Sequence, residues 1–164
     1  RRRYVHPIQP VSLQKPFHMA VDFQVDAFPQ SPRTPILLGF FASNDSIRDH
    51  SLVLQVEGPS QLSLWMPTPD KPKPRSITTR APLVAGKVYR LEFENTGPLG
   101  RFRMALAEPS DRFHPLFRSE QLLDRSVSTE AWDELGAALS ETASEPNPSG
   151  PVGQYRLLKV SFGR

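Results

Sequence analysis

The 164-residue sequence contains no cysteine. Disulfide bonds, thiolate-bound metal ions and cysteine nucleophiles are therefore excluded, and the folded chain must be stable without covalent cross-links. The sequence also lacks the run of about 18 apolar residues that a membrane-spanning helix requires. The arginines at positions 1–3 lead into Tyr4 and Val5 rather than into the apolar stretch of a signal peptide. We therefore expect no membrane span.

Sequence motifs that would indicate an enzyme are also missing. The chain has neither a phosphate-binding glycine loop nor a serine nucleophile of the Gly-x-Ser-x-Gly type. The four histidines, His6, His18, His50 and His114, are isolated from one another, and none has a second histidine at the spacing of a zinc site. We therefore expect a protein that is not an enzyme and has no zinc site.

Two pairs of acidic residues are the remaining candidates for catalysis. Glu92 and Glu94 lie on one face of a predicted strand, about 7 Å apart, a spacing that suits the two carboxylates of an inverting glycosidase. Asp22 and Asp26 lie on one face of another predicted strand, about 13 Å apart. Alternating acids are also typical of a strand face exposed to water, and we favour this interpretation. A β-sandwich glycoside hydrolase or lyase is kept as an alternative.

An excess of charge of one sign is absent as well, since 20 Lys and Arg residues against 17 Asp and Glu residues give a net charge of +3. Nucleic-acid binding by a sheet requires basic residues interleaved with exposed aromatic rings. Arg101 and Arg103 flank Phe102 in this way, but Phe102 is in phase with Met104 and Leu106. We predict Phe102 in the core and expect no nucleic-acid partner.

Proline and glycine are abundant, with 18 and 9 residues respectively. They divide the chain into short segments, several of which alternate apolar and polar residues as antiparallel strands do. The pattern predicts a single all-β domain over residues 1–164, an antiparallel, jelly-roll-like β-sandwich. The predicted strands cover residues 17–27, 36–42, 52–57, 61–66, 87–94, 101–106 and 155–162, with hairpins over 52–66 and 87–106.

Three segments do not follow the strand pattern. Residues 67–76 contain four prolines and are predicted to form an exposed loop. Residues 129–140 place Trp132, Leu135 and Leu139 at helical spacing behind possible capping residues, which predicts one short helix. Residues 140–153 are rich in Ser, Pro, Gly and Glu, a composition typical of a mobile loop.

Trp65 is a candidate ligand-binding residue. It is out of phase with Leu62 and Leu64 and is therefore predicted to point away from the face that they share. An indole ring in this position could stack on a sugar, or it could pack under the proline-rich loop that follows. The sequence leaves both interpretations open.

The polar segment 43–49 supplies the other candidates, Asn44, Asp45 and Asp49. Their side chains carry the oxygen atoms that calcium prefers, although the alternating acids and terminal glutamate of an EF-hand loop are missing. A simple polar turn after a buried strand is the alternative interpretation. Calcium at this segment is the one cofactor that the sequence leaves open, and no other cofactor is expected.

Residues 77–123 resemble the second half of a PA14-type domain. Residues 83–93 are similar to the family's turn and strand of pattern aGxxYxIxIE, residues 102–109 to a strand that enters a proline loop, and residues 115–123 to a closing IPxxxL element. The resemblance implies a β-sandwich of the kind found in lectins, adhesins, toxins and carbohydrate-active enzymes. Calcium-dependent lectins of that family carry adjacent aspartates where this chain has Asn44 and Asp45.

Residues 17–66 resemble a different β-sandwich, the jelly roll of laminin-G and concanavalin A. The similarity lies in spaced phenylalanines in the first strands, followed by Leu-Val-Leu-x-Val at 52–56 and a glycine turn. This resemblance also implies an association with carbohydrate.

These observations together predict a non-catalytic, lectin-like module that recognises a glycan. We expect it to belong to a larger extracellular or cell-surface protein with flanking domains. The alternative is a protein–protein interaction domain, in which the 67–76 loop and the helix around Trp132 would contact a protein ligand.

Overall fold

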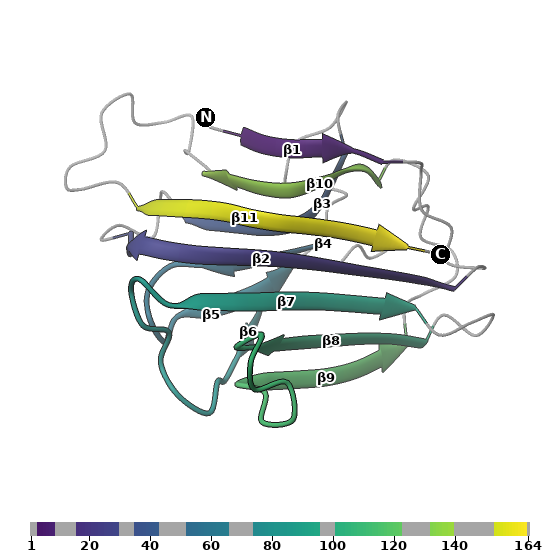
Figure 1. The fold of residues 1–164 in the computed structure, drawn as a ribbon. Helices are drawn as coiled ribbons and strands as arrows, with labels where there is room; N and C mark the ends of the chain where they lie inside the picture. Colours follow the sequence, from purple (N-terminus) through teal and green to yellow (C-terminus); the bar gives the residue numbers. More distant parts are fainter. Residues whose placement is uncertain are drawn as a thin grey trace.

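The computed structural model describes residues 3–8, 16–29, 35–42, 52–65, 74–95, 101–122, 132–139 and 153–163. Within them, strands form two antiparallel sheets that lie one behind the other, as the predicted sandwich requires (Figure 1). None of the described residues forms a helix long and apolar enough to cross a membrane.

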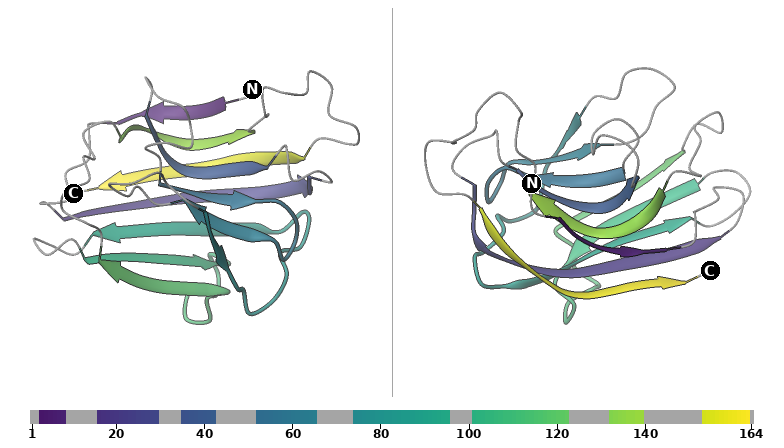
Figure 2. Two further views of the ribbon diagram at one scale, coloured as in Figure 1. Left: turned by 180° about the vertical axis from the view of Figure 1, so that it is seen from behind. Right: turned by 90° about the horizontal axis from the view of Figure 1, so that it is seen from above.

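The two sheets have different strand orders. The view from above separates them into two layers (Figure 2). The six-stranded sheet has the order β1 (Arg3–Pro7), β10 (Trp132–Leu139), β3 (Ile36–Ala42), β4 (Leu52–Val56), β5 (Leu62–Trp65), β6 (Pro74–Ile77). The five-stranded sheet has the order β11 (Gln154–Gly163), β2 (Phe17–Ala27), β7 (Val88–Asn95), β8 (Arg101–Ala107), β9 (Phe117–Leu122).

Apolar residues on the inner faces of the sheets form the core. The inward positions predicted for β2 are all buried, at 4% exposure or less. Phe40 of β3 connects the layers, because its ring centroid lies 5.8 Å from that of Phe17 and 6.0 Å from that of Phe93, both in the five-stranded sheet. Phe102 is also buried, as predicted. The period-two pattern therefore located the core correctly.

The hairpins agree with the sequence prediction. β4 and β5 pair across the turn at 57–61, where the Glu57 N–H donates to the Gln61 carbonyl. β7 pairs with β8, and the final strand β11 pairs with β2 near the start of the chain. These pairings place β2 and β7 in the middle of the five-stranded sheet.

The predicted helix over 129–140 is wrong. Residues 132–139 form strand β10, which pairs with β1 on one side and β3 on the other. Leu135 and Ala137 are fully buried and lie two residues apart, as in a strand. Hydrogen bonding on both edges and this burial outweigh the helix propensity of an Ala- and Leu-rich segment. The alternative in which a helix around Trp132 contacts a protein ligand therefore loses its helix.

The proline-rich segment is shorter than predicted at its C-terminal end. Pro74–Ile77 form β6, which pairs with β5 at the edge of the six-stranded sheet. Proline is tolerated in an edge strand because one side of such a strand makes no ladder hydrogen bonds. The remainder of the predicted loop, residues 67–73, lies outside the described residues, as do residues 140–152 of the predicted mobile loop.

Candidate functional site

The outer face of the five-stranded sheet presents its polar side chains in three rows that run across the strands. Strand pairing fixes these rows, because residues that are directly opposite each other project from the same face. The first row is Lys159, Asp22, Arg90 and Ala107; the middle row is Ser161, Ala20, Glu92, Ala105 and Arg118; the third row is Gly163, His18, Glu94, Arg103 and Glu120.

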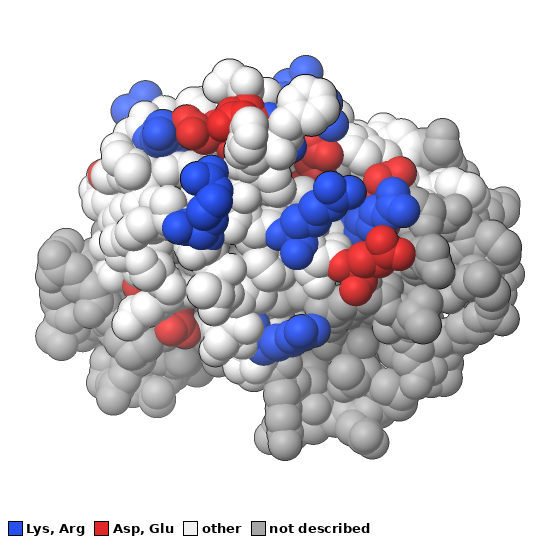
Figure 3. Space-filling model, turned by 90° about the horizontal axis from the view of Figure 1, so that it is seen from below, with Lys and Arg blue, Asp and Glu red and all other residues white. Residues whose placement is uncertain are grey.

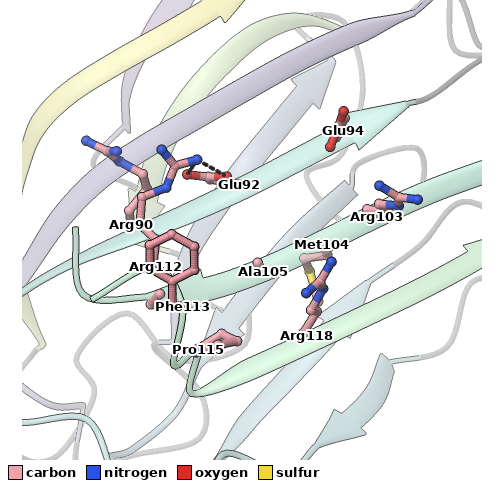
Figure 4. Close-up of a pocket in the computed structure, with 11 residues that line it drawn as sticks. Arg90, Glu92, Glu94, Arg103, Met104, Ala105, Arg112, Phe113, Pro115 and Arg118 are labelled. Carbon is pink, nitrogen blue, oxygen red and sulfur yellow. Dashed lines mark hydrogen bonds and ion pairs between the residues drawn. The ribbon is translucent and has the colours of Figure 1, made fainter. Parts of the chain in front are cut away.

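Two neighbouring hollows follow the middle row and share three lining residues, and we refer to them together as the groove. Ala20 and Ala105 lie on its floor on either side of Glu92, while longer charged side chains of the flanking rows, such as Arg90 and Arg103, line its sides. Its larger part, about 480 Å³, lies over β7, β8 and β9, and its smaller part, about 110 Å³, lies over β2 and β11. Figure 4 shows the larger part, with Arg103 and Arg118 on one side and Arg112 with Phe113 on the other.

An ion pair between Arg112 and Glu92 separates the two parts of the groove. The Arg112 Nη2 atom lies 3.2 Å from Oε1 of Glu92, and the pair is drawn as dashed lines in Figure 4. Nε2 of His18 lies 3.7 Å from Oε2 of the same carboxylate. Arg90, Glu92 and Arg112 line both parts. Glu92 is thus in contact with both Arg112 and His18.

Arg90 is fixed beside this divide by Asp22. The Arg90 Nε and Nη2 atoms donate to the two carboxylate oxygens of Asp22 at 2.6 and 3.0 Å. These hydrogen bonds raise the pKa of the Arg90 guanidinium. Such a two-point contact holds the planar guanidinium in one orientation. Arg90 is therefore a preorganised part of the groove wall.

The loop 108–116 carries Arg112 and Phe113 over the groove. Hydrogen bonds hold this loop in place: the Leu116 N–H donates to the Leu106 carbonyl at 2.8 Å, and Arg80 Nη2 donates to the His114 carbonyl at 3.1 Å. Phe113 is 96% exposed. An aromatic ring that is held in solvent by a braced loop provides an apolar contact surface at the rim of the groove.

The charge around the groove is mixed, with a positive excess. Five cationic side chains and three carboxylates line its two parts: Arg90, Arg103, Arg112, Arg118 and Lys159, against Asp22, Glu92 and Glu94. Figure 3 shows the molecule from below. Some of the Lys and Arg side chains on this side (blue) have an Asp or Glu side chain (red) next to them. Arg103, for example, lies 3.3 Å from Glu120.

The residues singled out from the sequence fall in different places. Glu92 and Glu94 share the outer face, as predicted, and line one groove. Trp65 is on the outer face of the other sheet, where it packs against Leu37, Phe41 and Val53, and its Nε1–H donates to Gln55 at 2.7 Å. Its role as a ligand-binding residue stays a prediction.

The remaining candidates, Asn44, Asp45 and Asp49, lie outside the described residues, so calcium binding there also stays a prediction. In the described part of the chain, no group of three or more His, Asp or Glu side chains is placed to hold a metal ion.

Most groove residues were not identified from the sequence. The outward position of Arg90 follows from strand alternation, because Tyr89 and Leu91 on either side of it are buried in the core. Arg112 and Phe113 belong to an irregular loop that carries no periodic signal. Lys159 is directed to the outer face by a register shift between Leu157 and Lys159, which a regular two-residue period does not predict.

No protein-family model matches the chain, and no curated protein matches it at a significant level. Solved structures do share its fold. A protein of unknown function from Shewanella oneidensis MR-1 has a TM-score of 0.65 and 15% identity over 95% of this chain. Alginate lyase PA1167 from Pseudomonas aeruginosa has a TM-score of 0.56 and 14% identity over 92%. Sheep galectin-11 has a TM-score of 0.53 and 12% identity over 97%.

These likenesses concern the fold, because the sequence identities are low. The fold agrees with the concanavalin-like jelly roll expected from residues 17–66, whereas the PA14 resemblance stays a prediction. The chain spans 60% of the Shewanella protein, 65% of the alginate lyase and 96% of the galectin.

Proposed function

We propose that this domain is a non-catalytic carbohydrate-binding module whose ligand lies in the groove on the outer face of the five-stranded sheet. The groove itself is the observation that carries the proposal. Its alanine floor leaves room for a flat ring, and its walls present guanidinium donors such as Arg103 and carboxylate acceptors such as Glu94. A sugar, whose hydroxyl groups both donate and accept hydrogen bonds, can use both kinds of group.

Two further observations support this proposal. Phe113 stands at the rim, where its exposed ring can pack against the C–H face of a sugar. The structures that share the fold include a galectin and an alginate lyase, which are carbohydrate-related β-sandwiches. From the sequence patterns described above, we further propose that this domain is one module of a larger protein that works outside the cell.

Blocking the floor of the groove tests the proposal. Ala105 belongs to β8 and lines the groove, so Ala105→Trp fills the space without changing an inward-facing residue. We expect wild-type protein to bind glycans on an array and in calorimetric titration, and the variant to bind at least about tenfold more weakly. Ser76→Trp, at an exposed position of β6 in the other sheet, is the matched control and should bind like wild type.

Circular dichroism and urea unfolding establish that both tryptophan variants are folded. Absence of wild-type binding to neutral, amino and acidic glycans would refute the proposal. Equal binding by Ala105→Trp and wild type would remove the groove as the binding site.

A lyase is the second candidate, favoured by the position of His18. A lyase acting on a uronate chain removes the proton from the carbon that bears the carboxyl group, the glycosidic C–O bond at the β carbon breaks, and an acid protonates the departing oxygen. His18 lines the smaller part of the groove and could accept that proton, and Arg112, which lines the same space, could neutralise the carboxylate.

This second candidate makes a separate prediction. An active protein would convert polyuronate to an unsaturated product with ultraviolet absorbance, and His18→Ala would lose that activity while it still bound the polymer. Binding of the polymer by the wild-type protein without formation of the unsaturated product would leave the non-catalytic proposal in place.

A further inference from the structure

We infer that the ligand of this groove is an acidic glycan chain that lies across the strands, with its carboxylate or sulfate groups bound by Arg118 at one end and Lys159 at the other. The inference rests on the proposed carbohydrate-binding function and specifies its ligand class and direction.

The first observation is that these two cations have no ion-pair partner among the residues that the structure describes. Among the described residues, Arg118 and Lys159 form no ion pair, whereas Arg90 is paired with Asp22 and Arg112 with Glu92. Both side chains are exposed and both line the groove. A cation whose charge is not neutralised within the protein attracts an anionic ligand group. The groove therefore has two anchoring points for negative charge.

The second observation is the position of these anchoring points. Arg118 is on β9 and Lys159 is on β11, the two edge strands of the five-stranded sheet. Neighbouring strands are about 4.8 Å apart, so four steps separate the edge strands by about 19 Å. A single sugar ring is too short for this span. The ligand that uses both cations is therefore a chain with more than one negative group.

The middle row provides a path for such a chain. Ser161, Ala20 and Ala105 are small, so a ligand can lie low between the taller side chains of the flanking rows. The Arg112–Glu92 ion pair crosses this path between the two parts of the groove. The chain would place sugar rings on both sides of this ion pair, with the guanidinium of Arg112 available to its hydroxyl groups.

The same residues favour a glycan over a nucleic acid. Three carboxylates, Asp22, Glu92 and Glu94, line the groove, and sugar hydroxyl groups can donate hydrogen bonds to them, whereas backbone phosphates cannot. Single-stranded nucleic acid also depends on several aromatic rings for base stacking, and Phe113 is the one aromatic residue in the described lining. A uronate chain carries hydroxyl groups beside each acidic group, so it can use both the cations and the carboxylates of this mixed surface.

Calorimetry with oligogalacturonates of increasing length tests the inference, with carboxyl-reduced chains of the same lengths as uncharged counterparts. We expect the charged chains to bind at least about tenfold more tightly than the reduced chains and to weaken as salt increases. Arg118→Ala and Lys159→Ala should each weaken binding of the long charged chain about tenfold. For the shortest chain, at most one of the two substitutions should have an effect. Arg75→Ala, at an exposed position of β6, should bind like wild type.

The outcomes separate this inference from the proposed function. Equal binding of charged and reduced chains would overturn the inference and leave carbohydrate binding intact. Binding of neither series, nor of any glycan on the array, would refute the proposed function itself. Tighter binding of a single-stranded DNA than of the oligogalacturonates would overturn the inference in favour of a nucleic-acid ligand.

Discussion

Gly39 occupies a position in β3 where a side chain does not fit. It pairs with Gly136 of β10 on one side and with Val53 of β4 on the other. Its φ angle is +140°, and an added Cβ would lie against the backbone carbonyl of Leu52, inside van der Waals contact. Because both neighbouring strands are held by hydrogen bonds, neither can move away without disturbing the sheet. Glycine at this position is thus required by the close approach of the backbones.

We expect Gly39→Ala to lower the free energy of unfolding by about 3 kcal/mol, from steric overlap and an unfavourable φ angle. Urea denaturation monitored by circular dichroism measures this loss. Gly163→Ala is the control, because an added Cβ there meets no atom within 4 Å. A Gly39→Ala variant with the wild-type unfolding midpoint would contradict this account.

At the scale of strands, β11 and β2 are joined by a polar contact at their outer faces. Asp26 of β2 accepts hydrogen bonds from Gln24 Nε2 at 2.7 Å and from Arg156 Nε of β11 at 2.9 Å. The hydrogen bond from Gln24, with help from Arg156, lowers the pKa of Asp26 from its ordinary value of 3.8. The contact therefore stabilises the folded protein only while the carboxyl group is ionised.

The sign of the pH dependence follows from this lowered pKa. The contribution of Asp26 is fully present above about pH 4 and is lost as the pH falls through the folded-state pKa. We expect Asp26→Asn to unfold at a lower urea concentration than wild type near neutral pH, with a difference that shrinks below pH 4. Unfolding midpoints measured across a pH series test this. A difference that stays constant into strong acid would show that Asp26 does not act through its charge.

Strands β2 and β10 show how much of the fold could be predicted from the sequence. The alternation of Phe23 and Val25 with polar residues is local, so the burial pattern of β2 was predictable. In β10, Leu135 and Leu139 fit a helical and an extended period equally well, and only pairing with β1 and β3 decides between them. The groove depends on register between distant strands: Lys159, Asp22 and Arg90 become neighbours through pairings that span most of the chain. No short segment contains that information.

For the molecule as a whole, Phe40 connects the two layers through its ring contacts. Its ring, from the six-stranded sheet, lies within 6.5 Å of the rings of three phenylalanines, Phe17, Phe93 and Phe162, in the five-stranded sheet. Removing it would leave a cavity at the centre of the sandwich, since aromatic rings contribute a large share of core packing.

We expect Phe40→Ala to lower the free energy of unfolding by about 4 kcal/mol. This is a large fraction of the total for a typical domain, which is about 5–15 kcal/mol. Phe113→Ala, in the exposed loop 108–116, is the counterpart and should leave the unfolding midpoint unchanged while it weakens glycan binding. Urea unfolding and calorimetry on the two variants measure both effects. A loss of stability in Phe113→Ala equal to that of Phe40→Ala would contradict the separation between core and groove.

The alternation of side chains along β2 and β7 has a consequence for how such a domain can diversify. Odd-numbered positions, such as Phe23 and Phe93, hold the two layers together, whereas even-numbered positions, such as Asp22 and Glu92, face the outer side that carries the groove. Substitutions at the even positions can therefore change the shape and charge of the groove without loosening the interior. One scaffold can in this way present many different outer surfaces while its inner residues stay the same.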